Sequence, residues 1–220
     1  MDNPLPKVIN ILGYDGSNLA MLFESLSANN FKGNLNIIMN DKIKRADAPF
    51  QTNIRHKIFH FSEIETPENN FVFCSNKPST KQFLMQFFQE KWNIRKEQFF
   101  SFHHHSSVMA SSVICGAGFY MEPLSVVSAY AKIGFGVTVS RNCSIGHHNI
   151  LHDYCSVYAG SNLAGNAEIC EAATVGPSCT IFCNTKIGKN SIIGGGSVVT
   201  KDIPDNVLAY GNPCKIIQKL

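Results

Sequence analysis

Two adjacent histidines, His147 and His148, and a glycine eighteen residues after the first, Gly165, are the residues whose types and spacing best suit chemistry. A neutral imidazole can take a proton from an attacking group, and a glycine N–H can donate to an oxygen that gains negative charge. Acyl transfer from a thioester needs both, because the attacking amine loses a proton while the carbonyl oxygen becomes anionic. From spacing alone, the two histidines could also be solvated surface residues.

An aliphatic residue recurs at every sixth position from Ile133 to Val199. This period fits neither a helix nor a strand, and it predicts a parallel β-helix in which each hexad forms one short face of a coil. Small residues at the fourth position after most of these aliphatics suit tight corners. Three hexads complete one turn of a triangular prism, so residues eighteen apart stack at roughly 4.8 Å, the spacing of neighbouring strands. His147 and Gly165 are therefore expected to be neighbours on adjacent coils.

The repeat has an irregular start and a definite end. Earlier hexads begin on apolar residues, at Val108, Ile114, Tyr120 and Val126. The next aliphatic of the period is Ile133, one residue late, which predicts a bulge or small loop between Val126 and Ile133. After Val199, the segment KDIPDNVLAYGNPCKIIQKL is expected to leave the prism as an extended tail and to cover its open end.

The first hundred residues alternate strand and helix patterns. Strands are predicted at residues 8–12, 35–39 and 71–74, a helix follows the turn GYDGSN, and a second amphipathic helix covers residues 81–90. Such alternation predicts a small parallel sheet, a Rossmann-like half. Together these patterns give an α/β N-terminal domain over residues 1–102, a parallel β-helix over 103–204 and a tail over 205–220.

Ligands of parallel sheets usually bind outside the carboxyl ends of the strands. In this chain the residues expected there are Gly13, Asp15, Gly16, Ser17, Asn40, Asp41, Ser75 and Asn76. The glycines form only part of the dinucleotide pattern G-x-G-x-x-G, so NAD binding is not supported. The crevice could hold a nucleotide, with Asn40 and Asp41 facing its ribose or base, or it could be an ordinary turn.

Composition excludes several classes of protein. The chain has 220 residues, 44% of them hydrophobic, and a net charge of +3 without a basic cluster, which disfavours nucleic acid as partner. The amino terminus shows neither a signal peptide nor a membrane span, so the expectation is a cytoplasmic protein. The eight cysteines include no CxxC pair, and we interpret them as reduced packing residues.

Metal and covalent catalysis are the weaker interpretations. His147 and His152 have the five-residue spacing of β-helix zinc enzymes of the γ-carbonic anhydrase type, but the third ligand expected near residue 111 is replaced by Ser111 and Ser112. We therefore expect no metal. The cysteine on the column of His147 is Cys183, two coils or roughly 10 Å away, so a cysteine nucleophile is not expected.

Over nearly its whole length the chain resembles the bacterial hexapeptide-repeat acyltransferases that N-acetylate nucleotide-linked amino sugars, close to the sialic-acid O-acyltransferase group. The resemblance is carried by ILGYDGSN, IIMND, FVFCSN and FHHHSSVMASSVICGAG, and most specifically by IGHHNILHDYCSVYAGSNLAG, IIGGGSVVTKDIPDN and YGNPCKII. It implies a left-handed β-helix, an exception to the usual right-handed crossover, and a homotrimer with acetyl-CoA between neighbouring subunits.

The resemblance also implies roles for particular residues. His147 would be the general base, with His148 as a second catalytic candidate, and Gly165 would donate its N–H to the thioester oxygen. The acetyl-CoA-binding residues would be Ser156, Gly165, Pro177 and Lys186. The nucleotide sugar would bind at Gly13, Asp15, Gly16, Ser17, Asn40, Asp41 and Asn76, and its sugar would reach the adjoining subunit.

The sequence departs from the family pattern at three places. His148 stands where relatives often have Asp or Glu after the base, so the group that orients His147 is open. Ser156 stands where many relatives have a histidine near the thioester. Ser17 and Asn18 replace the usual His-Gly of the first loop.

The leading hypothesis is direct transfer of acetyl from acetyl-CoA to the amine of a nucleotide-linked amino-deoxy sugar, such as a 4-amino-4,6-dideoxy hexose, for surface glycan biosynthesis. O-acetylation of a sugar hydroxyl could use the same base, although a hydroxyl needs more help to lose its proton. A zinc hydratase and a non-catalytic nucleotide-sugar-binding protein are the alternatives of other classes. The sequence does not choose among UDP, dTDP and GDP as the carrier.

Overall fold

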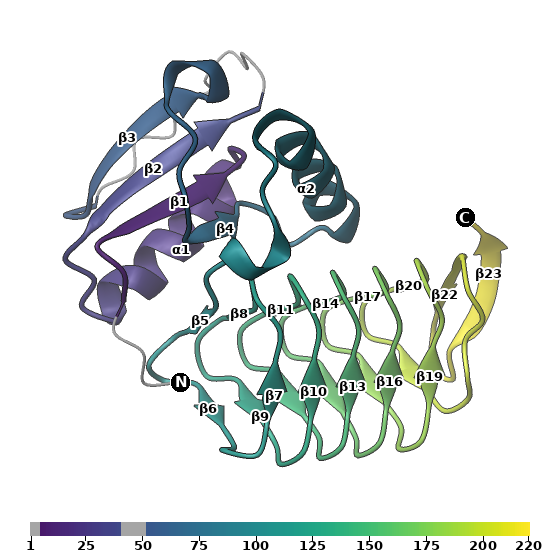
Figure 1. Cartoon of the computed structure of the whole chain (residues 1–220). Coiled ribbons are helices and arrows are strands. Elements are labelled where there is room, and N and C mark those ends of the chain that lie inside the picture. The colour runs from purple at the N-terminus through teal and green to yellow at the C-terminus, as the bar shows by residue number, and fades with distance from the viewer. Residues whose placement is uncertain (1–4, 41–51) are drawn as a thin grey trace.

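A small parallel sheet with two helices lies over one end of a long β-helix in the computed structural model of the chain (Figure 1), which describes residues 5–40 and 52–220. The α/β elements are β1 (Val8–Leu12), α1 (Gly16–Ala28), β2 (Asn34–Met39), β3 (Arg55–His60), the 3-10 turn η1 (Phe61–Glu63), β4 (Phe71–Phe73), α2 (Pro78–Trp92) and the 3-10 turn η2 (Lys96–Gln98). Neither α1 nor α2, the two α-helices of the described residues, is long and apolar enough to cross a membrane.

The α/β domain is a four-stranded parallel sheet in the order β3-β2-β1-β4. Helix α1 begins where the Asp15 side chain accepts a hydrogen bond from Asn18 N at 2.9 Å, a typical N-cap. Helix α2 has Pro78 in its first turn and is followed by the C-cap residue Asn93, which adopts the left-handed conformation. The parallel sheet is confirmed, but β3 was not predicted because four of its six residues are polar and none of the six is fully buried.

The β-helix has three flat faces, each a ladder of two-residue parallel strands, and we name each face after its first strand. The β5 face contains β5 (Phe102–His103), β8 (Tyr120–Met121), β11 (Thr138–Val139), β14 (Ser156–Val157), β17 (Thr174–Val175) and β20 (Ile192–Ile193). The β6 face contains β6 (Val108–Met109), β9 (Val126–Val127), β12 (Ser144–Ile145), β15 (Asn162–Leu163), β18 (Thr180–Ile181) and β21 (Val198–Val199). The β7 face contains β7 (Ile114–Cys115), β10 (Lys132–Ile133), β13 (Ile150–Leu151), β16 (Glu168–Ile169) and β19 (Lys186–Ile187).

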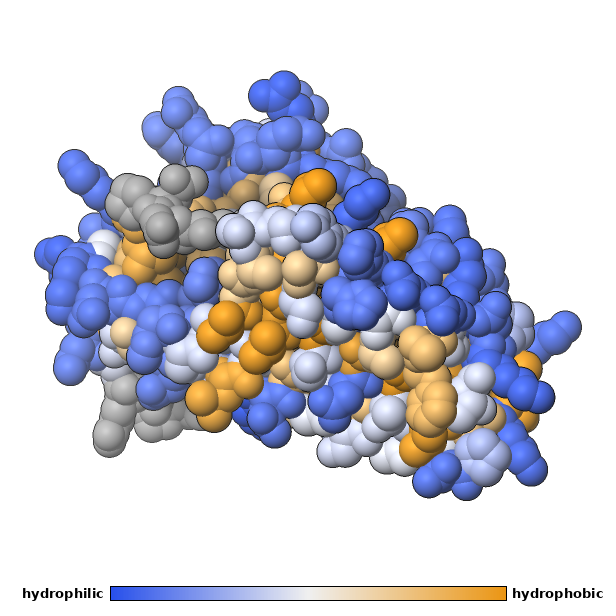
Figure 2. All heavy atoms as spheres, turned by 90° about the horizontal axis from the view of Figure 1, so that it is seen from below, coloured by the Kyte–Doolittle hydropathy of each residue, from blue (hydrophilic) through white to orange (hydrophobic). Residues whose placement is uncertain are grey.

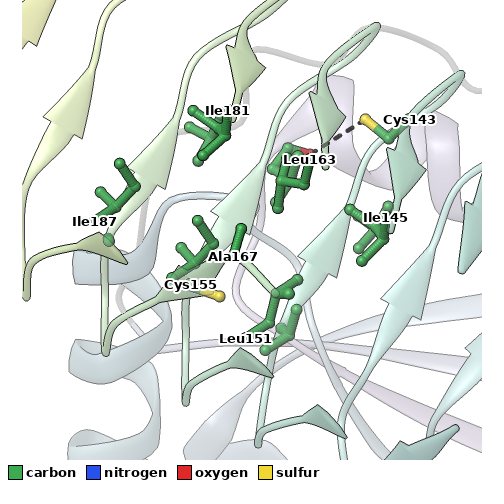
Figure 3. Packing of buried hydrophobic residues seen from close by; sticks show 14 of the residues in the cluster. Cys143, Ile145, Leu151, Cys155, Leu163, Ala167, Ile181 and Ile187 are labelled. Carbon is green, nitrogen blue, oxygen red and sulfur yellow. Dashed lines mark hydrogen bonds between the residues drawn. The ribbon is translucent and has the colours of Figure 1, made fainter. Parts of the chain in front are cut away.

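Residues eighteen apart pair directly, as the six-residue period predicts. Ile145 pairs with Leu163, and Leu163 pairs with Ile181. These side chains point into the prism (Figure 3), where the aliphatic of every hexad from Ile133 to Val199 is buried in one continuous core. Because this apolar column runs the length of the prism, burial of these aliphatics is the main favourable contribution to its stability.

The predicted slip between Val126 and Ile133 is wrong. Strands β9 and β10 keep the six-residue spacing, and Ile133 pairs with Cys115 one coil earlier. The inward residues of the first coils are Met109, Cys115, Met121 and Val127. The apolar residues that the pattern treated as core positions point outward instead, and Val108, Ile114 and Val126 are 61%, 66% and 42% exposed.

The end of the chain stays with the prism longer than expected. Strand β22 (Val207–Tyr210) pairs in parallel with β20 and so extends the β5 face, and β23 (Lys215–Lys219) returns antiparallel along β22. Val207 and Ala209 belong to the core of the β-helix. The segment after residue 204, expected to leave the prism, therefore begins as another strand of it.

The α/β domain packs on the β5 face near its start (Figure 1). Ser25 of α1 shares a hydrogen bond of 2.7 Å with the Tyr120 hydroxyl, and the Phe73 ring lies 5.8 Å from the Phe135 ring. In a triangular prism, the corner between the β6 and β7 faces is the one opposite the β5 face. The chain turns at this corner, which we call the histidine corner, at residues 146–149.

Candidate active site

The two candidate histidines lie at the histidine corner, between β12 and β13. His148 adopts the left-handed conformation, with φ 57°, and its N–H donates to Ala129 O on the previous coil at 3.0 Å. One coil further on, Asn166 has φ 60° at the equivalent place. The corner is thus the same tight turn repeated every eighteen residues, and in this coil it carries two exposed imidazole rings.

The His147 ring lies directly over Gly165. A Cβ atom added to Gly165 would stand 2.5 Å from both Cε1 and Nε2 of His147, closer than any real side chain allows. Glycine is thus required there if the ring keeps this position. Among the described residues, the Gly165 N–H has no hydrogen-bond acceptor, and His147 Nε2 has no partner. An unpaired imidazole nitrogen and an unpaired backbone N–H therefore adjoin each other at the surface, as the eighteen-residue spacing predicts.

The second histidine is in contact with the first. His147 Nδ1 and His148 Nδ1 are 3.0 Å apart, within hydrogen-bond distance. On its other side the His148 ring lies against the Tyr130 ring, with centroids 5.0 Å apart. Sequence reasoning missed Tyr130, although it precedes His148 by eighteen residues and the same stacking rule places it there.

The predicted acetyl-CoA residues do not converge within one chain. Gly165 is at the histidine corner, exposed Pro177 is at the corner between the β5 and β6 faces, and exposed Lys186 is on the β7 face, where its Nζ lies 3.1 Å from Glu168 Oε1. Ser156 is only 1% exposed, because the α/β domain covers it. The expectation that Ser156 binds acetyl-CoA is therefore corrected for the single chain, because its hydroxyl is buried and donates to Asn76 O at 2.6 Å.

The predicted nucleotide-sugar residues do gather at one edge of the α/β sheet. Gly13 follows β1, Asn40 follows β2 and Asn76 follows β4, while Asp15, Gly16 and Ser17 form the start of α1. Gly13 has φ 92°, which a glycine adopts without strain. Asp41 lies outside the described residues. These residues lie at the place where the strand order reverses, between β1 and β4, which is the usual ligand position in such sheets.

Asn76 connects this crevice to the β-helix. Its side-chain amide donates to Glu122 Oε1 at 3.1 Å, and Glu122, 1% exposed, also accepts from Arg141 N at 3.0 Å. The Asn76 side chain is therefore engaged by the seam between the two parts of the chain and does not project freely into the crevice.

Lys81 is a buried charge-bearing residue at the same seam that the sequence did not reveal. Its Nζ donates to Gly136 O at 2.7 Å, to Ser156 Oγ at 3.1 Å and to Thr138 Oγ1 at 3.2 Å. Burial lowers the pKa of Lys81 from 10.5 to about 7. A lysine within an amphipathic helix normally faces solvent, so no sequence signal marks this one.

A metal site containing both His147 and His152 is absent from the described residues. His152 lies at the turn between the β7 and β5 faces, where it bonds Glu168 at 3.0 Å, and the one group with metal-ligand spacing there is His152, Glu168 and Cys170. Lys186 Nζ lies 3.1 Å from the same Glu168 oxygen, so a lysine ammonium is already paired with the carboxylate that a metal would need.

All eight cysteines are free, and none lies beside His147. Burial raises the pKa of Cys155 to about 12, which disfavours its thiolate. Cys183 is exposed on the column of His147, but two coils away. The geometry therefore offers no cysteine nucleophile at this site.

No family model matches the sequence. Galactoside O-acetyltransferase from Escherichia coli is 35% identical over 117 residues, covering 50% of this chain and 55% of the relative. The enzyme of the same name from Lactococcus lactis is 50% identical over 50 residues, covering 23% and 24%. The chain thus spans about half the length, or less, of the curated relatives it matches.

Solved structures match the chain almost end to end. The acetyltransferase domain of PglB from Neisseria gonorrhoeae in complex with acetyl coenzyme A has a TM-score of 0.81 at 19% identity, covering 96% of this chain and 99% of the other. A variant of perosamine N-acetyltransferase from Caulobacter crescentus in complex with CoA and GDP-perosamine has a TM-score of 0.78 at 23% identity, covering 98% and 99%. WeeI from Acinetobacter baumannii has a TM-score of 0.76 at 18% identity, covering 96% and 100%. The predicted fold class, an α/β domain followed by a left-handed parallel β-helix, is confirmed.

Proposed function

We propose that this protein is an acetyltransferase that moves the acetyl group of acetyl-CoA to the amine of a nucleotide-linked amino sugar. The observation that carries the proposal is the His147 ring over the Gly165 backbone, with an unpaired imidazole nitrogen beside an unpaired N–H donor. The acetyl-CoA, CoA and GDP-perosamine bound in proteins of the same fold supply the chemical class of the substrates. The names of the curated relatives agree with acetyl transfer.

In the proposed reaction the amine attacks the thioester carbonyl carbon directly. His147 Nε2 takes the proton that the amine loses as the new C–N bond forms, and the Gly165 N–H stabilises the anionic carbonyl oxygen. Collapse of the tetrahedral intermediate breaks the C–S bond, and the CoA thiolate takes the proton held by His147. The products are an amide and free CoA, with no acyl-enzyme.

The proposal requires at least two copies of the chain for one site. The nucleotide crevice belongs to the domain on the β5 face, while His147 lies at the opposite corner of the prism. A nucleotide sugar bound in one copy can therefore meet the base of a neighbouring copy, and Pro177 and Lys186 would contact acetyl-CoA from such a neighbour. We propose that this assembly is the homotrimer implied by the family resemblance, a closed ring in which every crevice meets a histidine corner.

The surface beside the histidine corner supports this assembly. Apolar side chains gather on the side of the prism away from the α/β domain (Figure 2). Val108 and Val126 on the β6 face, Ile114 on the β7 face and Tyr130 at the corner between them are all exposed, Tyr130 by 60%. Apolar side chains that cluster beside a candidate site are typical of a contact surface between subunits.

N-acetylation is favoured over O-acetylation by the extent of the structural matches. The proteins that match this chain over 96% or more of its length include the sugar N-acetyltransferase bound to GDP-perosamine. O-acetylation is the second candidate, because two curated relatives are named galactoside O-acetyltransferases. The linkage of the product decides, since an ester is lost in mild alkali and an amide is not.

We place the reaction in the cytoplasm, as a step in making a surface glycan. Eight free cysteines, seven of them buried or half-buried, fit a compartment that keeps thiols reduced.

The experiment that tests the function is CoA thiol release by the purified protein with UDP-, dTDP- and GDP-linked 4-amino-4,6-dideoxy sugars. We expect turnover of one of these sugars, and its loss in a His147→Ala variant that keeps its oligomeric state. Absence of turnover with every amine, together with measurable binding of acetyl-CoA, would contradict the proposed acceptor. Binding of the nucleotide sugar without binding of CoA would support the non-catalytic alternative, and activity that is lost with EDTA and restored by zinc would support the metal alternative.

A further inference from the structure

The two rings of the histidine corner are joined through the same kind of nitrogen. His147 Nδ1 and His148 Nδ1 lie 3.0 Å apart, with the ring planes nearly perpendicular at 86°. A hydrogen bond between two nitrogens needs one proton between them, with one nitrogen as donor and the other as acceptor. The protonation states of the two rings are therefore coupled.

Only one of the two neutral arrangements leaves His147 able to act as a base. If His147 Nδ1 carries the proton and donates to His148 Nδ1, His147 Nε2 keeps a free lone pair. If His148 Nδ1 carries the proton, His147 is protonated at Nε2 instead, and the nitrogen that faces the Gly165 backbone cannot accept another. The tautomer of His148 therefore determines whether His147 Nε2 is free to accept a proton.

Contacts with neighbouring residues hold both the backbone and the ring of His148 in place. Its backbone is held in the left-handed turn by the bond to Ala129 O, and its ring lies 5.0 Å from the Tyr130 ring at an angle of 34°. His147 is placed in turn by the close approach of its ring to Gly165. Both rings are exposed, but each has a partner that restricts its orientation.

No charged side chain competes for these nitrogens among residues 5–40 and 52–220. The ion pairs found there are at other corners and at the seam, and the titratable group that faces the pair is the Tyr130 phenol. The pair can take one extra proton at His147 Nε2 without losing its hydrogen bond. A second extra proton would set two N–H groups against each other at 3.0 Å and so would break this hydrogen bond.

We propose that His148 is a positioning residue that accepts the proton of His147 Nδ1 and so holds His147 in the tautomer whose Nε2 is the base. This inference rests on the proposed function in that His147 is taken as the base of acetyl transfer. It assigns to a neutral imidazole the part that a carboxylate could also play, and a carboxylate introduced at position 148 would favour the protonated form of its neighbour.

Two substitutions at His148 distinguish control of the His147 tautomer from a purely structural role. His148→Phe keeps an aromatic ring against Tyr130 and removes the acceptor, and Tyr130 itself shows that an aromatic residue fits this left-handed turn, with φ 62°. His148→Glu supplies an acceptor with a negative charge. Asn142→Phe is the matched control, because Asn142 is exposed with φ 57° at a different corner.

Two readouts are needed, one with substrates and one without. We expect His148→Phe to lower kcat by about 10- to 100-fold with KM for acetyl-CoA unchanged, similar to the loss of a partner that orients a metal-bound histidine. We expect His148→Glu to keep activity at high pH and to move the acid limb of the pH profile upward by about one unit or more. Asn142→Phe should match the parent protein in both.

The second readout needs no substrate. It is the rate at which diethyl pyrocarbonate modifies His147, measured by mass spectrometry at several pH values, and it reports on the free Nε2. Its midpoint should move upward in His148→Glu by the same amount as the acid limb. Parent-like kcat, pH profile and modification midpoint in both His148 variants would overturn the inference. If the midpoint moves but no variant, nor the parent protein, transfers acetyl to any acceptor, the pairing stands and the proposed function fails.

Discussion

Lys81 Nζ lies 3.1 Å from Ser156 Oγ at the seam between the α/β domain and the β5 face. The lysine is 1% exposed, and its other two acceptors are the Gly136 carbonyl and the Thr138 hydroxyl, all of them on the β-helix. Burial lowers the pKa of this lysine to about 7. A proton equilibrium near neutral pH is thereby placed inside the contact that fixes the two parts of the chain together.

Lys81→Met should change how the stability of the protein depends on pH. The unfolded chain holds the lysine proton up to its ordinary pKa of 10.5, whereas the folded chain releases it near 7. Between these values the unfolded state binds more protons, so Lys81 makes the free energy of unfolding rise with pH, by up to about 1.4 kcal/mol per unit. The Met variant should lack this rise, and urea unfolding at several pH values from 7 to 10 measures it. Lys77→Met, at an exposed position beside α2, is the control. If the free energy of unfolding changes with pH in the same way in the parent protein and in Lys81→Met, the prediction is wrong.

Gly165→Ala should abolish most of the activity without unfolding the protein. The new methyl group would meet the end of the exposed His147 side chain, which can rotate away, so the fold tolerates the change while the base leaves its position. We expect a fall in kcat of about 100-fold or more, the usual size of losing a base or an oxyanion contact. Thermal unfolding checks that the variant is folded, and steady-state kinetics measure the change in kcat. A variant with normal stability and normal kcat would show that the position of the His147 ring does not matter.

Two substitutions of Asp15 should separate its part in the helix from its part in the crevice. Asp15→Ala removes the N-cap of α1 and should cost about 1 kcal/mol of stability, while Asp15→Asn keeps a capping oxygen and should cost little. If the carboxylate also contacts the nucleotide sugar, both variants bind it more weakly. Calorimetry of binding beside thermal unfolding distinguishes the two effects, and unchanged affinity in Asp15→Asn would remove Asp15 from the binding site.

A charge on the apolar surface beside the histidine corner should break the assembly. Ile114→Glu places a carboxylate at a side chain that is 66% exposed in the single chain, where it cannot harm the core. We expect a shift from trimer to monomer and a parallel loss of activity, measured by light scattering and thiol release. Phe83→Asp, at a 54% exposed apolar position on α2, should leave the oligomeric state unchanged. Persistence of the trimer in Ile114→Glu would place the subunit contact elsewhere.

The repeat made much of the fold predictable from the sequence. A period of six over twelve hexads identifies the prism, and the eighteen-residue rule that follows from it brought His147 onto Gly165 without any structural information. The same rule would have found Tyr130 beneath His148. Regular coils allow this because each residue's neighbours are set by a fixed offset along the chain and not by distant contacts.

The predictions from the sequence that were wrong also have a physical cause. Hydrophobic pattern reports that a side chain avoids water, but not what covers it, so the outward Val108, Ile114 and Val126 were taken for core residues and a slip was predicted to accommodate them. Ser156 was predicted to bind acetyl-CoA because the sequence cannot show that the α/β domain covers it. Lys81 escaped notice for the same reason, since burial between two parts of a chain leaves no local signal.

The predicted nucleotide-sugar site and the histidine corner lie on opposite sides of the prism, so two inactive variants of the chain should be able to complement each other. If the proposed site is shared between copies, a chain that cannot bind the nucleotide sugar still offers its His147 to a neighbour, and a chain without His147 still offers its nucleotide-sugar site. Two separately inactive variants, mixed in equal amounts and reassembled, would therefore regain activity at about a quarter of the sites of a closed ring. A single-chain active site would regain none.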